Sequence, residues 1–322
     1  MSPSSPQSSS TSQLSLFEQP IGWLYAFWKF SRPHTIIGTS LSVFALYAIT
    51  VATIDSRFTA QSLEQLLGAW IACLCGNVYI VGLNQLEDVE IDQINKPHLP
   101  IAAGEFSRRQ AQLLIVVTGI LALLFAGLLG KWLFLMVSVS LAIGTAYSLP
   151  PIRLKRFPFW AALCIFSVRG AIVNLGLFSH FTWVLQDEKT LMPTLGVWAL
   201  TLFIVVFTFA IAIFKDIPDM EGDKQYNIST FTLKLGKDAV FNLALWVITA
   251  CYLAMIVASG LLLDSVNTVF FAVAHLAALG LMWWRSQTVD LQDKNAIAQF
   301  YQFIWKLFFL EYLIFPTAYL FA

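Results

Sequence analysis

The sequence predicts an all-α, polytopic membrane protein with about nine transmembrane helices. Hydrophobic residues make up 58% of the 322-residue chain and charged residues only 12%, about half the charged fraction of an average soluble domain. So few charges could not cover a soluble globule, so the chain is expected to lie in lipid. The net charge is zero, which gives no reason to expect a nucleic-acid partner.

Apolar segments of the length that crosses a bilayer, about 20 residues, recur along the chain. They lie near residues 35–53, 66–86, 110–129, 131–148, 157–178, 195–214, 239–262, 267–284 and 299–321. The amphipathic stretch LYAFWKFSRPHT precedes the first of them, and we expect it to lie along the membrane interface. The Ser-rich residues 1–20 predict a disordered tail, so the transmembrane domain is expected to span residues 21–322.

Lysine and arginine are divided unequally between the two sets of loops. Fourteen lie in the N-terminal lead-in and in the loops on its side of the membrane, against three, Arg57, Lys131 and Lys189, on the other side. By the positive-inside rule, the richer side faces the cytoplasm or, in a plastid, the stroma. An odd number of spans places the C-terminus on the opposite side.

An acidic motif follows the second span, in NQLEDVEIDQINKPHLP. Asn84, Asp88 and Asp92 are four residues apart, which puts their side chains along one helical face. Glu87 and Glu90 point away from that face and are expected to be solvated.

A second acidic motif, FKDIPDMEGDKQ, follows the sixth span on the same side of the membrane. Asp219 and Asp223 repeat the four-residue spacing, while Pro218 weakens the helix and leaves the direction of Asp216 open. Two carboxylates 4 Å apart repel by about 4 kcal/mol at an effective dielectric near 20, so cations must lie among these groups. An all-oxygen donor set suits a hard divalent ion, and Mg²⁺ keeps positions open for phosphate oxygens. A solvated loop is the alternative for either motif alone.

Basic residues beside the motifs could bind a diphosphate. Arginine makes bidentate contacts to phosphate, and lysine supplies a mobile point charge. The loops offer Lys96, Arg108, Arg109, Arg153, Lys155, Lys215 and Lys224, and YSLPPIRLKR adds Tyr147 at the end of the fourth span. For Arg153 and Lys155 the positive-inside rule is an equally good explanation.

Three further residues are candidates for binding an anionic co-substrate. Arg32 and His34, in SRPHTIIGTS, begin the first span, and a role in starting that helix explains them equally well. Arg169 lies inside the fifth span, where a charge usually faces the bundle interior or a cavity.

The two acidic motifs, their order and the number of spans resemble those of the UbiA superfamily of intramembrane prenyltransferases. Within it, RPHTIIGT, NQLEDVEIDQINKPHLPIAAGEFS, YSLPPIRLKR and KDIPDMEGD are similar to the homogentisate phytyltransferases. The resemblance implies a UbiA-type bundle around a central cavity. It also implies Mg²⁺-dependent transfer of a phytyl group from phytyl diphosphate to homogentisate, with decarboxylation, in tocopherol biosynthesis.

That resemblance also implies roles for individual residues. The metal ligands would be Asn84, Asp88, Asp92, Asp216, Asp219 and Asp223. Lys96, Tyr147, Arg153, Lys155, Lys215 and Lys224 would bind the leaving group. Arg32 and His34, with Arg169 as second choice, would bind the aromatic acid. The implied location is the thylakoid or plasma membrane of a cyanobacterial-type cell, or a plastid membrane.

Other functions stay open at this stage. Relatives using solanesyl or geranylgeranyl diphosphate share much of this pattern. A membrane metal-ion transporter would also use acidic ligands, although transporters tend to place them near the bilayer midplane. A CDP-alcohol phosphotransferase would need a D-x-x-D-G-x-x-A-R motif, which the sequence lacks.

Overall fold

The computed structural model describes residues 14–55, 59–189, 191–226, 228–263 and 265–322. In these residues every regular element is a helix, and nine helices are long and apolar enough to cross a membrane. The predicted all-α fold is therefore confirmed. Most of the predicted N-terminal tail, residues 1–13, and Arg57 lie outside the described residues.

The membrane-length helices correspond to the nine predicted spans. They are α2 (Pro33–Ile54), α3 (Ala60–Glu87), α5 (Arg108–Leu129), α6 (Lys131–Ser148), the continuous unit Pro158–Leu185, α9 (Leu195–Lys215), α12 (Lys237–Leu261), α13 (Thr268–Ser286) and α14 (Lys294–Leu320). Short elements connect them: α1 (Pro20–Phe30), α4 (Val89–Asn95), η1 (Leu154–Arg156), α10 (Met220–Gln225) and α11 (Phe231–Leu235). The last span starts five residues earlier than the predicted residue 299, because Asp293 caps the helix by accepting a hydrogen bond from the backbone N–H of Asn295.

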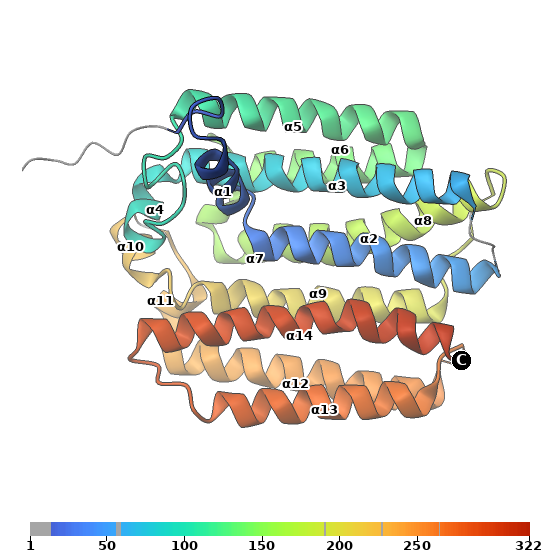
Figure 1. Ribbon diagram of the computed structural model, residues 1–322. Coiled ribbons are helices and arrows are strands. Elements are labelled where there is room, and N and C mark those ends of the chain that lie inside the picture. Colours follow the sequence, from blue (N-terminus) through green and yellow to red (C-terminus); the bar gives the residue numbers. More distant parts are fainter. Residues whose placement is uncertain (1–13, 56–58, 190, 227, 264) are drawn as a thin grey trace, which may run out of the picture.

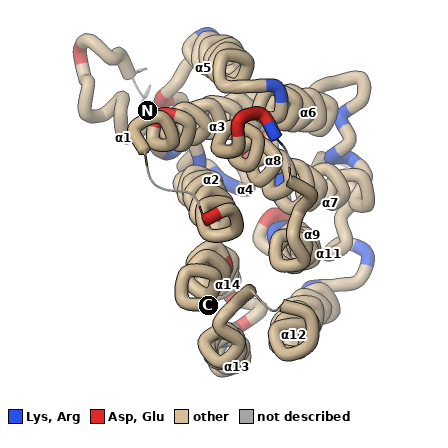
Figure 2. Tube along the Cα trace, turned by 90° about the vertical axis from the view of Figure 1, so that its right-hand side faces the viewer, with Lys and Arg blue, Asp and Glu red and all other residues tan. Residues whose placement is uncertain are grey.

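The long helices lie side by side, and the short ones gather at one end of the bundle. Figure 1 shows α1, α4, α10 and α11 at that end and the C-terminus at the other. Residues of α2, α3, α6, the unit Pro158–Leu185, α9 and α14 line a central cavity. Viewed along the bundle, α5 lies at one edge and α12 and α13 lie at the opposite edge (Figure 2). The described parts of both acidic motifs therefore lie at one end, as predicted, and the C-terminus at the other.

The fifth span is not a regular α-helix. It consists of α7 (Pro158–Phe166), a π-helical segment η2 (Ser167–Ile172) and α8 (Val173–Leu185). A Cβ atom on Gly170 would lie 2.8 Å from Val205 Cα, so glycine lets η2 approach the backbone of α9. π-Helical turns are rare and are found frequently at functional sites; this one carries Arg169.

Several polar groups within the spans form hydrogen bonds or ion pairs inside the bundle. Thr50 and Ser140 donate hydrogen bonds of 2.7 Å to the carbonyls of Leu46 and Met136, one turn earlier in each helix, since no water is available there. Glu311, for which the sequence indicates no partner, lies 3.2 Å from His275 across α13 and α14, with both side chains fully buried. This pair joins the two C-terminal helices away from the central space.

Candidate active site

The two acidic motifs meet at one end of the bundle. The Asn95 side-chain oxygen accepts a 2.9 Å hydrogen bond from the backbone N–H of Gly222. Next to it, Lys96 Nζ lies 2.5 Å from Asp219 Oδ2. Loops separated by more than a hundred residues are thus joined directly through α4 and α10.

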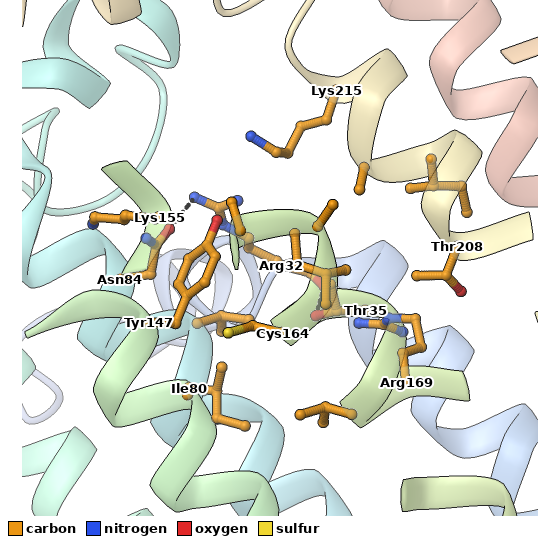
Figure 3. Close-up of a pocket in the computed structure, with 18 of the residues that line it drawn as sticks. Arg32, Thr35, Ile80, Asn84, Tyr147, Lys155, Cys164, Arg169, Thr208 and Lys215 are labelled. Carbon is orange, nitrogen blue, oxygen red and sulfur yellow. Dashed lines mark hydrogen bonds between the residues drawn. The ribbon is translucent and has the colours of Figure 1, made fainter. Parts of the chain in front are cut away.

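A cavity of about 310 Å³ opens beside these loops and extends into the bundle. Nearly all of the predicted site residues line it: Arg32, His34, Asn84, Asp88, Asp92, Lys96, Tyr147, Lys155, Arg169, Lys215, Asp216, Asp219 and Asp223. Figure 3 shows Asn84, Tyr147 and Lys155 on one side of the cavity and Arg169 and Thr208 on the other. Its mouth is charged, and its depth is mostly apolar.

The first motif is built around Asp88. Helix α3 ends at Glu87, and Asp88 connects it to α4, so the motif is not on the single continuous helix that the spacing predicted. Asn84 still donates a 2.9 Å hydrogen bond to Asp88 Oδ2. Two cations also reach Asp88: Arg153 Nη2 at 3.0 Å and Lys155 Nζ at 2.5 Å.

Arg153 and Lys155 come from the loop that follows α6. Pro150 and Pro151, joined by a cis peptide bond, turn the chain out of that helix, and Arg153 adopts a left-handed backbone conformation with φ of 40°. Lys155 is buried at the mouth of the cavity. Arg153 does not line the cavity but contacts it through Asp88.

The second motif is held by Lys215, the last residue of α9. Its Nζ lies 2.9 Å from Asp216 Oδ1 and 3.9 Å from Asp219 Oδ2. Asp219 precedes α10, and Asp223 lies in its first turn. Because Pro218 separates α9 from α10, the chain turns there, and Asp216, Asp219 and Asp223 all reach the cavity.

Burial raises the proton affinity of several of these carboxylates. It raises the pKa of Asp223 to about 7. The positive charge of Lys215 lowers this pKa, and the negative charges of Asp219 and Asp216 raise it further. Burial likewise raises the pKa of Asp92, more than Arg32 and Lys96 lower it. At Asp219 burial has the same direction, but Lys96 and Lys215 outweigh it, and the pKa falls. Asp92 and Asp223 therefore hold a proton more readily than a solvated aspartate does.

The donor atoms at the mouth fit a hard divalent cation. They are carboxylate and amide oxygens, and Asp92 Oδ2 is buried without a hydrogen bond. Among the described residues, no three His, Cys, Asp or Glu side chains are grouped as a ready-made metal cluster. Amino and guanidinium groups lie against Asp88 and Asp219 instead, so a metal ion would have to share or displace those contacts.

Other predicted residues lie away from the cavity. Glu90 pairs with Arg108 at 3.0 Å on the exposed surface, as expected for an acid that points away from the first motif. Glu221, in the second motif, pairs with Lys294 at 3.2 Å and is also exposed. Lys224 is also exposed and does not line the cavity, so its contact with a diphosphate stays a prediction.

Several lining residues were missed in the sequence. Asn95 follows Asp92 by three residues and so falls outside the four-residue spacing used to find the motif. Helix α14 contributes four aromatic side chains to the cavity wall: Tyr301, Trp305, Phe308 and Tyr312. Their spacing of four, three and four residues is that of one helical face, and this signal was present in the sequence.

Asn95→Ala is expected to lower the turnover of this site about tenfold or more. The change removes the hydrogen bond between the two motifs, and a misplaced catalytic group costs rate steeply. Initial-rate measurements on purified protein would test it. Gly222→Ala should have a similar effect, since its Cβ would lie 2.7 Å from the Asn95 amide. Unchanged rates in both variants would show that this contact does not position the motifs.

Comparison with known proteins identifies the family. The model of the UbiA prenyltransferase family matches residues 39–307. The chain is 56% identical over 296 residues to homogentisate phytyltransferase from Synechocystis sp., covering 92% of this chain and 96% of that one. It is 39% identical to homogentisate phytyltransferase 1, chloroplastic, from Arabidopsis thaliana, covering 91% and 75%. The structure of a UbiA homologue from Archaeoglobus fulgidus bound to GPP and Mg²⁺ matches with a TM-score of 0.61 and 17% identity, over 91% of this chain and 99% of that one. The chain belongs to the UbiA prenyltransferase family.

Proposed function

We propose that this protein transfers a phytyl group from phytyl diphosphate to homogentisate with loss of CO₂. It is an aromatic prenyltransferase, and the reaction is the one named by its 56% identical relative. The observation that carries the assignment is the joining of two acidic motifs at the charged mouth of a cavity that continues into the membrane-spanning bundle. A metal transporter is not favoured, because these carboxylates lie at the end of the bundle rather than at its middle.

The mouth is suited to hold a diphosphate together with a divalent ion. Asn84, Asp88, Asp92, Asp216, Asp219 and Asp223 would hold Mg²⁺, which supplies charge stabilisation to the departing pyrophosphate when bound. The bound GPP and Mg²⁺ in the Archaeoglobus homologue support this choice. Lys96, Lys155 and Lys215 would contact the phosphate oxygens, and Arg153 would act through its ion pair with Asp88. Tyr147 lies on the same side of the cavity as Asn84 and Lys155.

The chain's own residues then account for the course of the reaction. Lys96, Lys155 and Lys215 stabilise the negative charge that develops as the allylic C–O bond breaks and its electron pair leaves with pyrophosphate. The apolar depth of the cavity keeps water from the allylic cation. The electron-rich homogentisate ring attacks that cation, and the attacked ring carbon loses its proton. The carboxymethyl group loses CO₂, and its methylene carbon takes up a proton to become the methyl group of the product.

The apolar depth of the cavity would hold the prenyl tail. Met136, from α6, lines this depth and also lines a separate groove between α6 and α8. Met136 is 4% exposed, and Gly176 packs so closely on it that an added Cβ would lie 2.7 Å from Met136 Cβ. The Met136 side chain therefore separates the cavity from the groove.

Met136→Ala is expected to shift donor preference toward longer prenyl chains. Removing the Met136 side chain lets a solanesyl tail pass from the cavity into the groove, whereas the phytyl tail loses contacts. We expect the ratio of kcat/KM for solanesyl diphosphate to kcat/KM for phytyl diphosphate to rise about tenfold, as for the loss of a few methylene-sized contacts. Competition between phytyl and solanesyl diphosphate measures it. Val139→Ala, which enlarges the groove without reaching the cavity wall, is the matched control. An equal shift in both variants would contradict a separating role for Met136.

The experiment that tests the proposed function is product analysis with competing donors. Purified protein receives Mg²⁺, homogentisate and equal amounts of phytyl, geranylgeranyl and solanesyl diphosphate. We expect a decarboxylated phytyl quinol as the main product. A main product carrying another prenyl group would reassign the donor, and metal flux in proteoliposomes without any prenylated product would overturn the enzymatic assignment.

The protein is an integral membrane protein, as the nine membrane-length apolar helices among its described residues indicate. We propose that the end carrying the acidic motifs faces the cytoplasm or stroma, because lysine and arginine are concentrated in the loops at that end. The cyanobacterial and chloroplastic relatives support a thylakoid or plastid membrane.

A further inference from the structure

Arg169 is a cation inside the bundle without an anionic partner among the described residues. It lies in the π-helical segment of the fifth span and lines the cavity. Its ionisable neighbours include Tyr301, Tyr312 and His34, and it forms no ion pair with a carboxylate among the residues that the structure describes. An uncompensated charge in this position costs several kcal/mol. A ligand that brings an anion into the cavity would compensate it.

The guanidinium is fixed in place by its surroundings. It lies 5.1 Å from the Trp305 ring and 6.0 Å from the Phe308 ring, both on α14, distances at which cation–π attraction is effective. On the opposite side, a Cβ on Gly38 would lie 3.2 Å from Arg169 Nη1. The absence of a side chain at position 38 therefore makes room for the guanidinium.

The position of Gly38 also gives the depth of Arg169. Gly38 is one turn further along α2 than His34, about 6 Å deeper in the bundle, and His34 lies at the mouth beside Arg32. The His34 ring packs on Trp305 with 4.8 Å between ring centroids. The Trp305 ring therefore contacts both the guanidinium and the His34 ring.

The diphosphate does not need Arg169. Lys96, Lys155 and Lys215 already line the mouth where the acidic motifs meet. Arg32 belongs to the same group, since its Nη2 lies 3.4 Å from Asn84 Oδ1 and 4.0 Å from Asp92 Oδ2. Arg169 is one turn deeper and forms no ion pair with an acidic side chain among the described residues.

We propose that Arg169 binds the carboxylate of the aromatic acid acceptor, whose ring then lies toward the mouth against His34 and Trp305. This inference rests on the proposed function, because it takes homogentisate as the acceptor. A guanidinium binds a carboxylate through two parallel hydrogen bonds. The guanidinium lies about 6 Å deeper in the bundle than His34, and this distance leaves room for one aromatic ring. Of the residues considered for the acid, Arg169 takes its carboxylate and Arg32 acts at the diphosphate.

The test pairs a change in the protein with the same change in the ligand. Binding of homogentisate and of methylhydroquinone, which has the ring but no carboxylate, is measured by titration calorimetry on the purified full chain in detergent, without diphosphate. For Arg169→Gln we expect the Kd of homogentisate to rise at least about 30-fold, as for a lost charge-assisted contact. The Kd of methylhydroquinone should change less than about threefold, since its carboxylate is already missing.

Two further variants keep the result interpretable. Arg169→Lys retains the positive charge, so it should recover part of the homogentisate affinity while leaving that of methylhydroquinone unchanged. Arg285→Gln makes the same chemical change at an exposed position at the end of α13 and should alter neither ligand. Thermal unfolding of each variant checks that the bundle is intact.

The possible results separate the inference from the proposed reaction. An equal loss of affinity for both ligands in Arg169→Gln would overturn the inference, because the arginine would then support the cavity wall only. A rise in the KM of phytyl diphosphate with unchanged acid binding would overturn it as well. Arg169→Gln could weaken the binding of homogentisate but not of methylhydroquinone while the wild-type protein forms no prenylated quinol. In that case the proposed reaction fails, but the carboxylate site is supported.

Discussion

Asp88→Asn is expected to reduce prenyl transfer at least about 10³-fold. The variant removes a proposed metal ligand, and preorganised charges at reacting phosphates contribute several kcal/mol to the rate. It also leaves Arg153 and Lys155, which lie 3.0 and 2.5 Å from Asp88, without their counter-charge. Steady-state rates with phytyl diphosphate and homogentisate at saturating Mg²⁺ would measure the loss.

The neighbouring acid provides the control for this variant. Glu90→Gln makes the same chemical change two residues away, but Glu90 is exposed and pairs with the exposed Arg108, so the rate of this variant should stay within about twofold of wild type. Asp219→Asn, with Glu221→Gln as control, repeats the comparison at the second motif. Both asparagine variants should elute from size exclusion as wild type does. Retained activity in either of them would place the metal elsewhere.

Removal of divalent cations is expected to abolish turnover without unfolding the protein. The two acidic motifs are joined by the Asn95–Gly222 hydrogen bond and by the Lys96–Asp219 ion pair, and neither contact uses a metal. The fold at the mouth should therefore persist when the metal is withdrawn, while the leaving group loses its main source of charge stabilisation.

Activity and thermal unfolding of chelator-treated protein test this together. We expect activity to fall below detection and to return on adding Mg²⁺, with an unfolding temperature within a few degrees of the untreated protein. Full activity in excess chelator would contradict a metal-dependent reaction. A large drop in unfolding temperature would instead show that a metal ion holds the motifs together.

Much of the fold could be predicted because membrane helices depend on local sequence. Each span needs its own run of apolar residues, so the nine apolar runs predicted the nine membrane-length helices found in the part of the chain that the structure describes. The acidic motifs were equally local: four-residue spacing placed Asn84, Asp88 and Asp92 together, and all three line the cavity. Charged groups are costly in a low-dielectric environment, so Arg169 and the aspartates, which lie in or beside apolar spans, could be predicted to belong to a functional site.

The contacts between distant segments could not be predicted in the same way. Nothing in the sequence pairs Asn95 with Gly222 or Glu311 with His275, because those contacts depend on how helices pack. The π-helical turn at Arg169 is also unmarked, since it depends on the close approach of Gly170 to α9. The sequence also could not divide the two proposed roles between Arg32, at the diphosphate, and Arg169, at the carboxylate of the acid, because that assignment depends on how deep each side chain lies in the bundle.

The balance of charge at the mouth has a thermodynamic consequence. Five carboxylates (Asp88, Asp92, Asp216, Asp219 and Asp223) face five cationic side chains (Arg32, Lys96, Arg153, Lys155 and Lys215). A divalent ion arriving alone adds uncompensated positive charge, and a diphosphate arriving alone adds uncompensated negative charge. Only together do they come close to cancelling. Each ligand should therefore strengthen the affinity for the other by the same factor, as reciprocal linkage demands, so that metal and prenyl donor enter as a cooperative pair.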